Sequence, residues 1–194
     1  MKRVFILNGH PGESSLSKTF SEIYYLSSIK AGNEARIIHI SDLEFDIDFE
    51  GPGYRNIKPL EPALETVLEN LKWCDHLVIT SPTWWGGFPA KMKGLIDRVF
   101  LPGEVFDTRE TKMEMPKPLL KGRSARVFVT SDTPSLFMRF YYKNAFFRQI
   151  RDHILAFVGI KPVKITHFSR ASHATGEKIK RWMSVVEELA LRGD

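Results

Sequence analysis

The sequence predicts an α/β fold in which one parallel β-sheet is covered by helices on both faces. Three observations indicate this class: five short apolar segments rich in Val, Ile or Phe, five stretches with apolar residues at three- and four-residue spacing, and strict alternation of the two kinds along the chain. Because strands that are apolar nearly throughout are buried on both sides, we expect a doubly wound parallel sheet with right-handed crossovers.

Each expected element follows from its local pattern. The expected strands are Val4–Leu7, Arg36–Ile40, His76–Thr80, Arg126–Thr130 and Val163–His167. The expected helices are Leu16–Lys30, Pro62–Trp73, Ala90–Phe100, Arg139–Phe157 and Glu177–Leu191. The helical spacing is clearest in the second helix, where Leu64, Val67, Leu68 and Leu71 fall on one face and Pro62 suits the first turn.

Two connections are longer than usual for a compact domain, namely Ser41–Glu61 and Leu101–Gly122. Leu101–Gly122, which holds three Pro and mixed charge, is a lid, an oligomer contact or a solvated excursion, and the sequence leaves these alternatives open. No repeat, low-complexity tract or linker interrupts the chain. We therefore expect one domain spanning residues 1–194.

Composition excludes several classes of protein. The 194 residues are 43% hydrophobic and 26% charged, as in ordinary globular proteins. With only Cys74, the chain forms no intramolecular disulfide and no metal site built on Cys pairs, and its six His lack metal-ligand spacing. No apolar run approaches the roughly 18 residues of a membrane span, and the apolar run at the start is too short for a secretory signal. We expect a cytoplasmic protein that is not inserted in a membrane and holds no metal.

The net charge of +5 is unevenly distributed. Residues 1–116 hold 13 Lys and Arg against 17 Asp and Glu, and residues 117–194 hold 15 against 6. A basic half of this kind favours nucleic acid, anionic lipid or a phosphorylated small molecule as partner, or simply forms solvated helix faces.

The loop after the first expected strand has the residues of an anion pocket. His10 is followed by the hydroxyl residues Ser14, Ser15 and Ser17, which lead directly into a helix. Unpaired backbone N–H groups and the positive dipole end of a helix start favour a phosphate there. The loop lacks both the G-x-x-x-x-G-K-[ST] and the G-x-G-x-x-G patterns, which disfavours nucleotide hydrolysis and ordinary dinucleotide binding. The alternative is that the serines only cap the helix.

The loop after the third expected strand is unusually aromatic. Pro82, Thr83, Trp84, Trp85 and Gly86 follow the strand directly. Adjacent residues of an extended loop point in opposite directions, so the two Trp cannot both face a core, and one of them is expected to meet a flat aromatic ligand. A packing lid is the alternative.

Hydroxyl and acidic residues also follow the fourth expected strand, as Thr130, Ser131 and Asp132. In a sheet of order 2-1-3-4-5 the first, third and fourth strands are neighbours, so the three loops converge on one crevice at their carboxyl ends. The aromatic run 137–147 either roofs this crevice or forms a partly buried helix. Because no G-x-S-x-G or H-E-x-x-H motif is present, hydrolase and metalloenzyme functions are disfavoured.

The stretch Pro82–Gly103, with Gly51–Gly53 upstream and Ile154–Gly159 downstream, carries a family resemblance. The chain resembles flavodoxin-fold NAD(P)H:quinone oxidoreductases, including the modulator of drug activity type and the ancillary reductases of bacterial potassium-efflux systems. The resemblance covers nearly the whole chain, from His10 to about Gly159. It implies a flavodoxin-like, doubly wound five-stranded sheet of order 2-1-3-4-5.

The resemblance also implies a flavin site, for FAD or FMN. The expected cofactor-binding residues are His10, Ser15, Leu16 and Ser17 at the phosphate and ribityl chain, Pro82, Thr83, Trp84, Trp85 and Gly86 along the isoalloxazine ring, and Thr130, Ser131 and Asp132 on its other side. Mammalian relatives use a Tyr and a His after the fourth strand to balance charge during hydride transfer. Here that segment is shorter and lacks the His, which leaves Tyr141, Tyr142 or Lys143 as the expected catalytic substitutes.

The implied activity is transfer of hydride from NAD(P)H through the flavin to a quinone or similar small aromatic acceptor, by a two-electron ping-pong route. A homodimer without nucleic acid is expected. One alternative is a flavin-binding ancillary subunit that associates peripherally with a membrane cation transporter. Another is a flavodoxin-type electron carrier, which the net positive charge disfavours. The basic half of the chain predicts a preference for NADPH over NADH.

Overall fold

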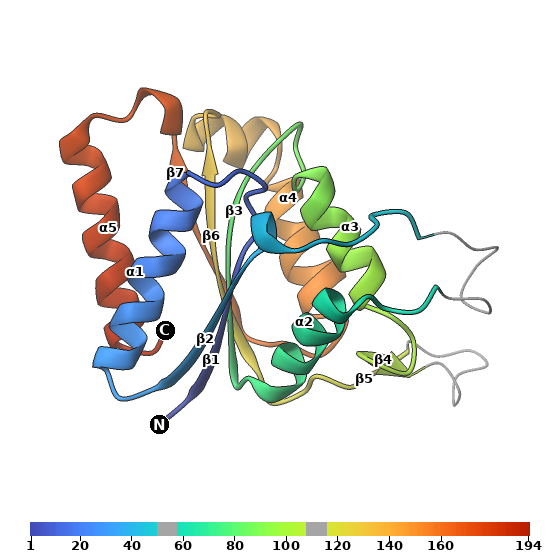
Figure 1. The fold of residues 1–194 in the computed structure, drawn as a ribbon. Helices are drawn as coiled ribbons and strands as arrows, with labels where there is room; N and C mark the ends of the chain where they lie inside the picture. The colour runs from blue at the N-terminus through green and yellow to red at the C-terminus, as the bar shows by residue number, and fades with distance from the viewer. Residues whose placement is uncertain (50–57, 108–115) are drawn as a thin grey trace.

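The structure is a computed structural model that describes residues 1–49, 58–107 and 116–194. A five-stranded sheet lies between two layers of helices, with α1 and α5 on one face and α2, α3 and α4 on the other (Figure 1). The strand order is β2-β1-β3-β6-β7, and every neighbouring pair in this sheet is parallel. Counted within the sheet, this is the predicted order 2-1-3-4-5, so the predicted fold class is confirmed.

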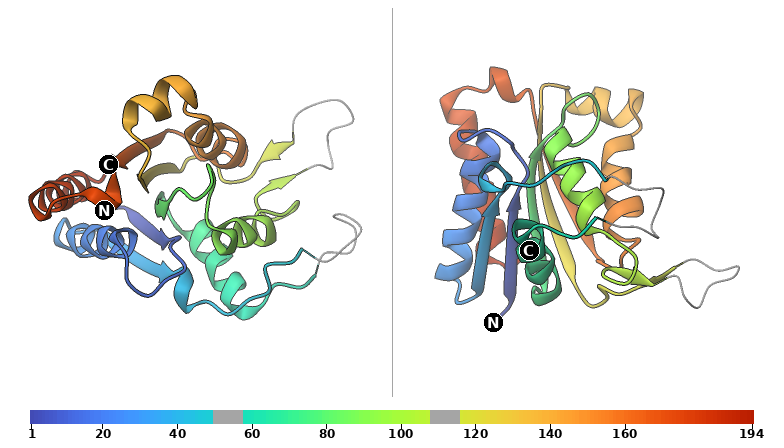
Figure 2. Two further views of the ribbon diagram at one scale, coloured as in Figure 1. Left: turned by 90° about the horizontal axis from the view of Figure 1, so that it is seen from above. Right: turned by 45° about the vertical axis from the view of Figure 1, so that its right-hand side comes forward.

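The strands that form the sheet are β1 (Arg3–Asn8), β2 (Glu34–His39), β3 (His76–Pro82), β6 (Ser124–Ser131) and β7 (Val163–Ser169). Each overlaps an apolar segment of the sequence. In register, Ile79 of β3 lies opposite Leu7 of β1 and Val127 of β6, and all seven residues of β3 are buried. The edge strands β2 and β7 are only partly buried. Figure 2 shows the sheet and the helices on its two faces from two further directions.

The helices are α1 (Leu16–Lys30), α2 (Pro62–Trp73), α3 (Ala90–Val99), α4 (Ala145–Arg148) and α5 (Gly176–Leu191), with short turns η1 (Ile40–Asp42) and η4 (Ala171–His173). Two of the longer helices begin with a side-chain cap. The Oγ of Ser15 accepts the backbone N–H of Lys18 at 3.1 Å, and Thr175 caps α5 in the same way through the N–H of Lys178.

Two hydrophobic cores stabilise the layers. One lies between the sheet and α2, α3 and α4, and includes Leu64, Met92 and Ile150. The other lies between the sheet and the pair α1 and α5, and includes Phe20 and Val186. Successive side chains of a strand point to opposite faces of the sheet, so the strands contribute to both cores. Both faces of the sheet are therefore covered, as the apolar strand sequences require.

The predicted fourth helix, Arg139–Phe157, is wrong as a continuous helix. The segment forms the wide π-type turns η2 (Phe137–Tyr141) and η3 (Gln149–Leu155) on either side of α4. Lys143 and Asn144 break it, because both adopt left-handed conformations with φ of +50° and +52°. A residue in that region cannot continue a right-handed helix.

The long connections contain structure that periodicity does not reveal. A short antiparallel pair, β4 (Phe106–Asp107) and β5 (Lys117–Pro118), flanks residues 108–115 within the predicted loop Leu101–Gly122. Gly51–Gly53 of the resemblance and the middle of both long connections lie outside the described residues.

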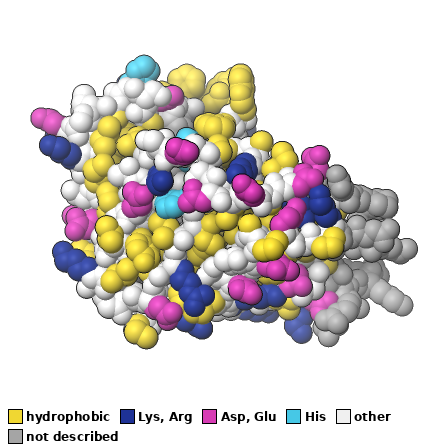
Figure 3. All heavy atoms as spheres, in the orientation of Figure 1, with side chains coloured by type: hydrophobic (Ala, Val, Ile, Leu, Met, Phe, Trp, Pro, Cys, Tyr) yellow, Lys and Arg dark blue, Asp and Glu magenta, His cyan; other side chains and the backbone are white. Residues whose placement is uncertain are grey.

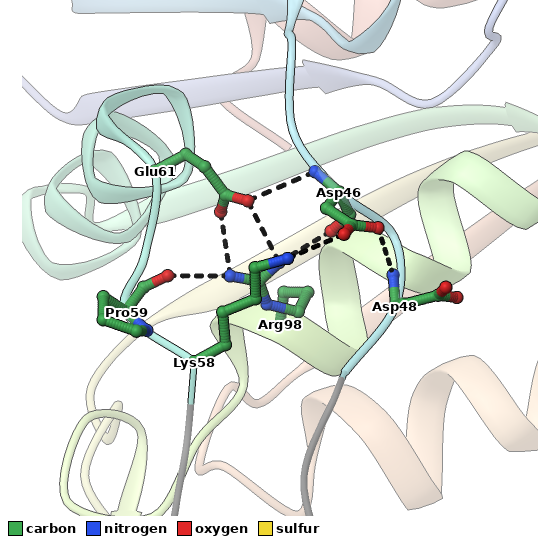
Figure 4. A network of polar contacts seen from close by, with 6 residues as sticks. All are labelled: Asp46, Asp48, Lys58, Pro59, Glu61 and Arg98. Carbon is green, nitrogen blue, oxygen red and sulfur yellow. Dashed lines mark hydrogen bonds and ion pairs between the residues drawn. The ribbon is translucent and has the colours of Figure 1, made fainter.

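A buried arginine ties the flanks of the other connection to α3 (Figure 4). The guanidinium of Arg98, 1% exposed, donates to the carbonyl oxygens of Asp46 at 2.7 Å and Pro59 at 2.9 Å, and to the Glu61 carboxylate at 2.8 Å. Burial raises the pKa of Glu61, but the hydrogen bonds from Arg98 and from backbone N–H groups outweigh it and hold the pKa below its usual value. Arg98 therefore joins two chain segments, one at Asp46 and the other at Pro59 and Glu61, that are separate in the sequence.

The surface is mixed in charge. On the face shown in Figure 3, acidic and basic side chains lie among each other with hydrophobic side chains between them. Within the described ranges, no helix is long and apolar enough to cross a membrane.

Candidate functional site

The carboxyl ends of β1, β3, β6 and β7 lie at one edge of the sheet, at the top in Figure 1. A cleft of about 320 Å³ opens there, which we call the serine cleft. Its lining residues are His10, Ser14, Ser15, Leu16, Ser17, Pro82, Thr83, Trp84, Thr130, Ser131, Asp132, Ala171 and Ser172. The volume lies in the range of small-molecule sites, and the position is the one at which parallel α/β sheets bind ligands.

The start of α1 forms one wall of the serine cleft. Leu16 and Ser17 stand in the first turn, where backbone N–H groups have no intrahelical acceptor, and no acidic residue occupies this turn. The Oγ of Ser17 is buried and has no hydrogen-bond partner among the described residues. A buried hydroxyl without a partner is costly, so this wall is built for a ligand that brings hydrogen-bonding atoms.

His10 is fixed beside this helix start by its neighbours. Its backbone N–H donates to Asn8 Oδ1 at 3.2 Å, and Asn8 is fully buried and held by Thr80. Its Nδ1 accepts the backbone N–H of Gly12 at 3.0 Å, so the neutral ring carries its proton on Nε2. The ring meets Trp84 edge-on, with centroids 5.6 Å apart.

The two tryptophans diverge at a tight turn. Trp84 and Gly87 exchange two backbone hydrogen bonds of 3.0 Å, and the residues between them, Trp85 and Gly86, have φ of +50° and +77°. Positive φ at both central residues is the signature of a type I′ hairpin turn. Trp84 lines the serine cleft, whereas Trp85 is fully exposed on the other side of the turn. The segment is thus a tight turn and not the extended loop that the sequence argument assumed, and neither Trp faces a core. That one of them meets a flat ligand stays a prediction.

A second cavity of about 450 Å³, the aromatic pocket, adjoins the serine cleft. Its lining residues are Thr83, Trp85, Gly86, Ser131, Asp132, Thr133, Met138, Tyr142, Ala145 and Phe146. Thr83, Ser131 and Asp132 line both cavities and form their shared wall. The Oγ1 of Thr83 is buried and, like that of Ser17, lacks a partner in the described part of the chain.

The shared wall is held in place by the last sheet strand and the turn that follows it. Asp132 accepts two hydrogen bonds of 2.7 Å from Ser172, one from the backbone N–H and one from the hydroxyl. These bonds hold the pKa of Asp132 below its ordinary value. The hydroxyl of Ser131 lies 2.7 Å from Nε2 of His167 on β7. The wall therefore depends on residues far away in sequence.

The structure brings together most of the predicted site residues. All the predicted cofactor-binding residues line one of the two cavities: Trp85 and Gly86 line the aromatic pocket, and the others line the serine cleft. Of the predicted catalytic residues, Tyr142 lines the aromatic pocket, whereas Tyr141 and Lys143 are exposed and line neither cavity. Sequence reasoning missed Ala171 and Ser172. The available signal was their place just beyond the carboxyl end of the last expected strand.

Comparison with known proteins agrees with this arrangement. A family model described as flavodoxin-like fold matches residues 2–189. The chain is 32% identical over 144 residues to an FMN-dependent NADH:quinone oxidoreductase of Cereibacter sphaeroides, which is 73% of this chain and 70% of that protein. It is 27% identical over 111 residues to an uncharacterized NAD(P)H oxidoreductase of Escherichia coli, covering 53% and 54% of the two chains.

Solved structures share the fold at lower identity. An NAD(P)H:quinone oxidoreductase from Methanothermobacter marburgensis superposes with a TM-score of 0.82 at 20% identity, covering 100% of this chain and 99% of that one. An FMN-dependent NADH-azoreductase from Bacillus anthracis gives 0.75 at 20% identity and covers 99% of each chain. With a family model that spans almost the whole sequence and a sheet of the matching order, the chain belongs to the flavodoxin-like fold family.

Proposed function

We propose that this protein is an FMN-dependent NADH:quinone oxidoreductase. The observation that carries the proposal is the serine cleft, in which a helix start and unpartnered buried hydroxyls adjoin an aromatic pocket across one shared wall. Its curated relative from Cereibacter sphaeroides bears this name and supports the choice of FMN over FAD.

The residues present fit FMN. The first turn of α1 and the Nε2–H of His10 offer donors to a phosphate, and the Ser17 hydroxyl supplies one of the hydrogen bonds that the protein leaves unmade. Pro82, Thr83 and Trp84 provide a backbone edge and an indole face for the flat ring.

When bound, FMN accepts a hydride from NADH and passes two electrons to the acceptor. The protein's part is to position the cofactor and the two substrates. The buried Met138 and Phe146 and the exposed Trp85 line the aromatic pocket with apolar surface that suits nicotinamide and quinone rings in turn. The Thr83 hydroxyl, which lies on the shared wall, is placed to donate where negative charge develops. Tyr142 is the proposed catalytic residue with a place in this pocket, and Tyr141 and Lys143 stay predictions.

The proposed function is tested by incubating the purified protein with flavin and then measuring NADH oxidation. We expect the purified protein to bind FMN, to show the flavin absorbance bands and to oxidise NADH with menadione as acceptor. Mass identification of the released flavin distinguishes FMN from FAD. A protein that stays colourless after incubation with either flavin and does not oxidise NADH would contradict the proposal. The preference for NADPH stays a prediction, which the ratio of kcat/KM values for the two donors measures.

Replacing Ser17 with alanine is expected to weaken FMN binding by about 10- to 100-fold, because a hydrogen bond to a charged group contributes roughly 1.5–3 kcal/mol. Fluorescence titration of the unloaded protein with FMN measures the effect. Ser28→Ala is the matched control, since Ser28 lies on the same helix with a buried, unpartnered Oγ but away from the cleft. Equal FMN affinities of the two variants would contradict the phosphate assignment.

We also propose that the protein is a homodimer. Large apolar side chains stand exposed beside the aromatic pocket, namely Trp85, Leu136, Phe137, Phe140, Tyr141 and Tyr142. Several large apolar side chains exposed in and around one short segment are typical of an interaction site, and in a homodimer a second copy would cover them.

Phe140→Glu is expected to shift the protein from dimer to monomer in sedimentation equilibrium. Phe140 is 67% exposed, and Leu26→Glu is the control because Leu26 is 65% exposed on α1. A wild-type protein that sediments as a monomer at micromolar concentration would argue against the dimer.

A further inference from the structure

We propose that His167 is a positioning residue for the bound cofactor and acts through the hydroxyl of Ser131. The inference rests on the proposed function, because it concerns the wall shared by the serine cleft and the aromatic pocket. His167 lines neither cavity, and it lies on the last strand of the sheet rather than on one of the site loops.

The contact between Ser131 and His167 is short and partly buried. Ser131 is the last residue of β6, is 7% exposed and lines both cavities. Its Oγ lies 2.7 Å from Nε2 of His167, and the ring of Phe147 packs against the imidazole with centroids 5.2 Å apart. A hydroxyl on one side and an aromatic ring on the other hold the imidazole in one orientation.

The imidazole determines what the Ser131 hydroxyl offers to a ligand. If Nε2 carries the lone pair, Ser131 donates to it and presents lone pairs to the cavities. If Nε2 carries the proton, Ser131 accepts, and its O–H donates either to the Thr133 carbonyl oxygen, at 3.3 Å, or to a ligand. Burial lowers the pKa of His167, which favours the neutral ring in which these two forms exist.

This choice matters at a redox site. A hydroxyl that donates stabilises negative charge on a reduced ring, whereas one that accepts stabilises a ring N–H. Because His167 holds the hydroxyl in one of these states, its removal releases the hydroxyl to rotate. The midpoint potential of the bound cofactor then changes even though His167 does not touch the cofactor.

The test is a double-mutant cycle with His167→Leu, Ser131→Ala and the double variant, read out as FMN dissociation constant and midpoint potential. We expect each single variant to shift the potential and to change FMN affinity by about 3- to 10-fold, the range of one neutral hydrogen bond. In the Ser131→Ala background, His167→Leu is expected to add nothing further. His167→Gln keeps a hydrogen-bonding group beside Ser131 and is expected to restore most of the wild-type potential.

The chain offers a matched control at the other end of the sheet. Nδ1 of His76 lies 2.8 Å from the Ser124 hydroxyl, a similar His–Ser pair that joins β3 and β6 away from the cavities. Ser124→Ala is expected to leave the midpoint potential unchanged. Full additivity of the two cleft variants, or a potential that His167→Leu does not move, would overturn the inference.

One further measurement separates this inference from the proposed function. In the unloaded protein, the imidazole nitrogen chemical shifts of His167 are expected to change in Ser131→Ala, whether or not FMN is the ligand. Failure of the wild-type protein to bind FMN would overturn the proposed function, and the proposal for His167 with it. FMN binding with a potential insensitive to His167 would overturn the positioning role alone.

Discussion

Arg98→Met is expected to lower the free energy of unfolding by about 3 kcal/mol, because removal of one partner of a buried ion pair leaves the other without compensation. The carbonyl oxygens of Asp46 and Pro59 lose the Arg98 donor, and the Glu61 carboxylate loses its charged partner but keeps the backbone N–H of Asp46 (Figure 4). Glu61 is 27% exposed at its side chain, so water recovers part of the loss, which places the effect at the lower end of the range for buried pairs. Urea denaturation measures the change.

Two further variants test whether the loss of stability in Arg98→Met comes from the unpaired Glu61 carboxylate. Arg98→Met combined with Glu61→Met removes both charges and is expected to be more stable than Arg98→Met alone, because no carboxylate is left unpaired. Arg151→Met is the surface control, since Arg151 and Asp152 form an exposed pair whose loss is expected to change stability by less than about 1 kcal/mol. If Arg98→Met and Arg151→Met lower the free energy of unfolding equally, the hydrogen bonds of Arg98 in Figure 4 do not stabilise the connection Ser41–Glu61.

Acidification from pH 7 to pH 4 is expected to reduce the free energy of unfolding by about 3 kcal/mol through His76 alone. Burial, with smaller effects of the positive charges of Lys2 and Arg126, lowers the pKa of His76 to about 4. In the unfolded chain His76 takes up a proton near pH 6.5, whereas in the folded protein it stays neutral until about pH 4. The unfolded state therefore binds more protons in this window, and stability falls as the pH falls.

Variants show how much of the pH dependence of stability comes from His76 and how much from other titratable groups. Burial also lowers the pKa of His39 and His167, so both add to the loss with the same sign. His76→Gln is expected to flatten the pH dependence of urea midpoints between pH 6.5 and 4. A pH dependence that is the same in His76→Gln and in the wild-type protein would contradict the buried neutral state.

The predicted site rests on patterns that are local in sequence. Hydroxyl and aromatic residues follow three apolar strands, and the handedness of crossovers brings such loops to one edge of a parallel sheet. For this reason His10, Ser17, Trp84 and Asp132 were predictable as neighbours although they lie far apart in the chain. Ser172 and His167 were not, because each takes part only through a partner, Asp132 or Ser131, that the packing of β7 against β6 supplies.

The amino-acid pattern is enough to predict the α/β class, the approximate bounds of most strands and helices, and the edge of the sheet at which the site lies. Hydrophobic periodicity and chain handedness act on neighbouring residues, so these features are readable without coordinates. The break at Lys143 and Asn144, the Arg98 network and the two cavities of the site emerge only from the folded structure. The network and the shared wall of the cavities depend on side chains that are distant in sequence, and a buried charge such as Arg98 persists only where surrounding groups compensate for it. The break depends on two left-handed residues, whose conformation hydrophobic periodicity does not reveal.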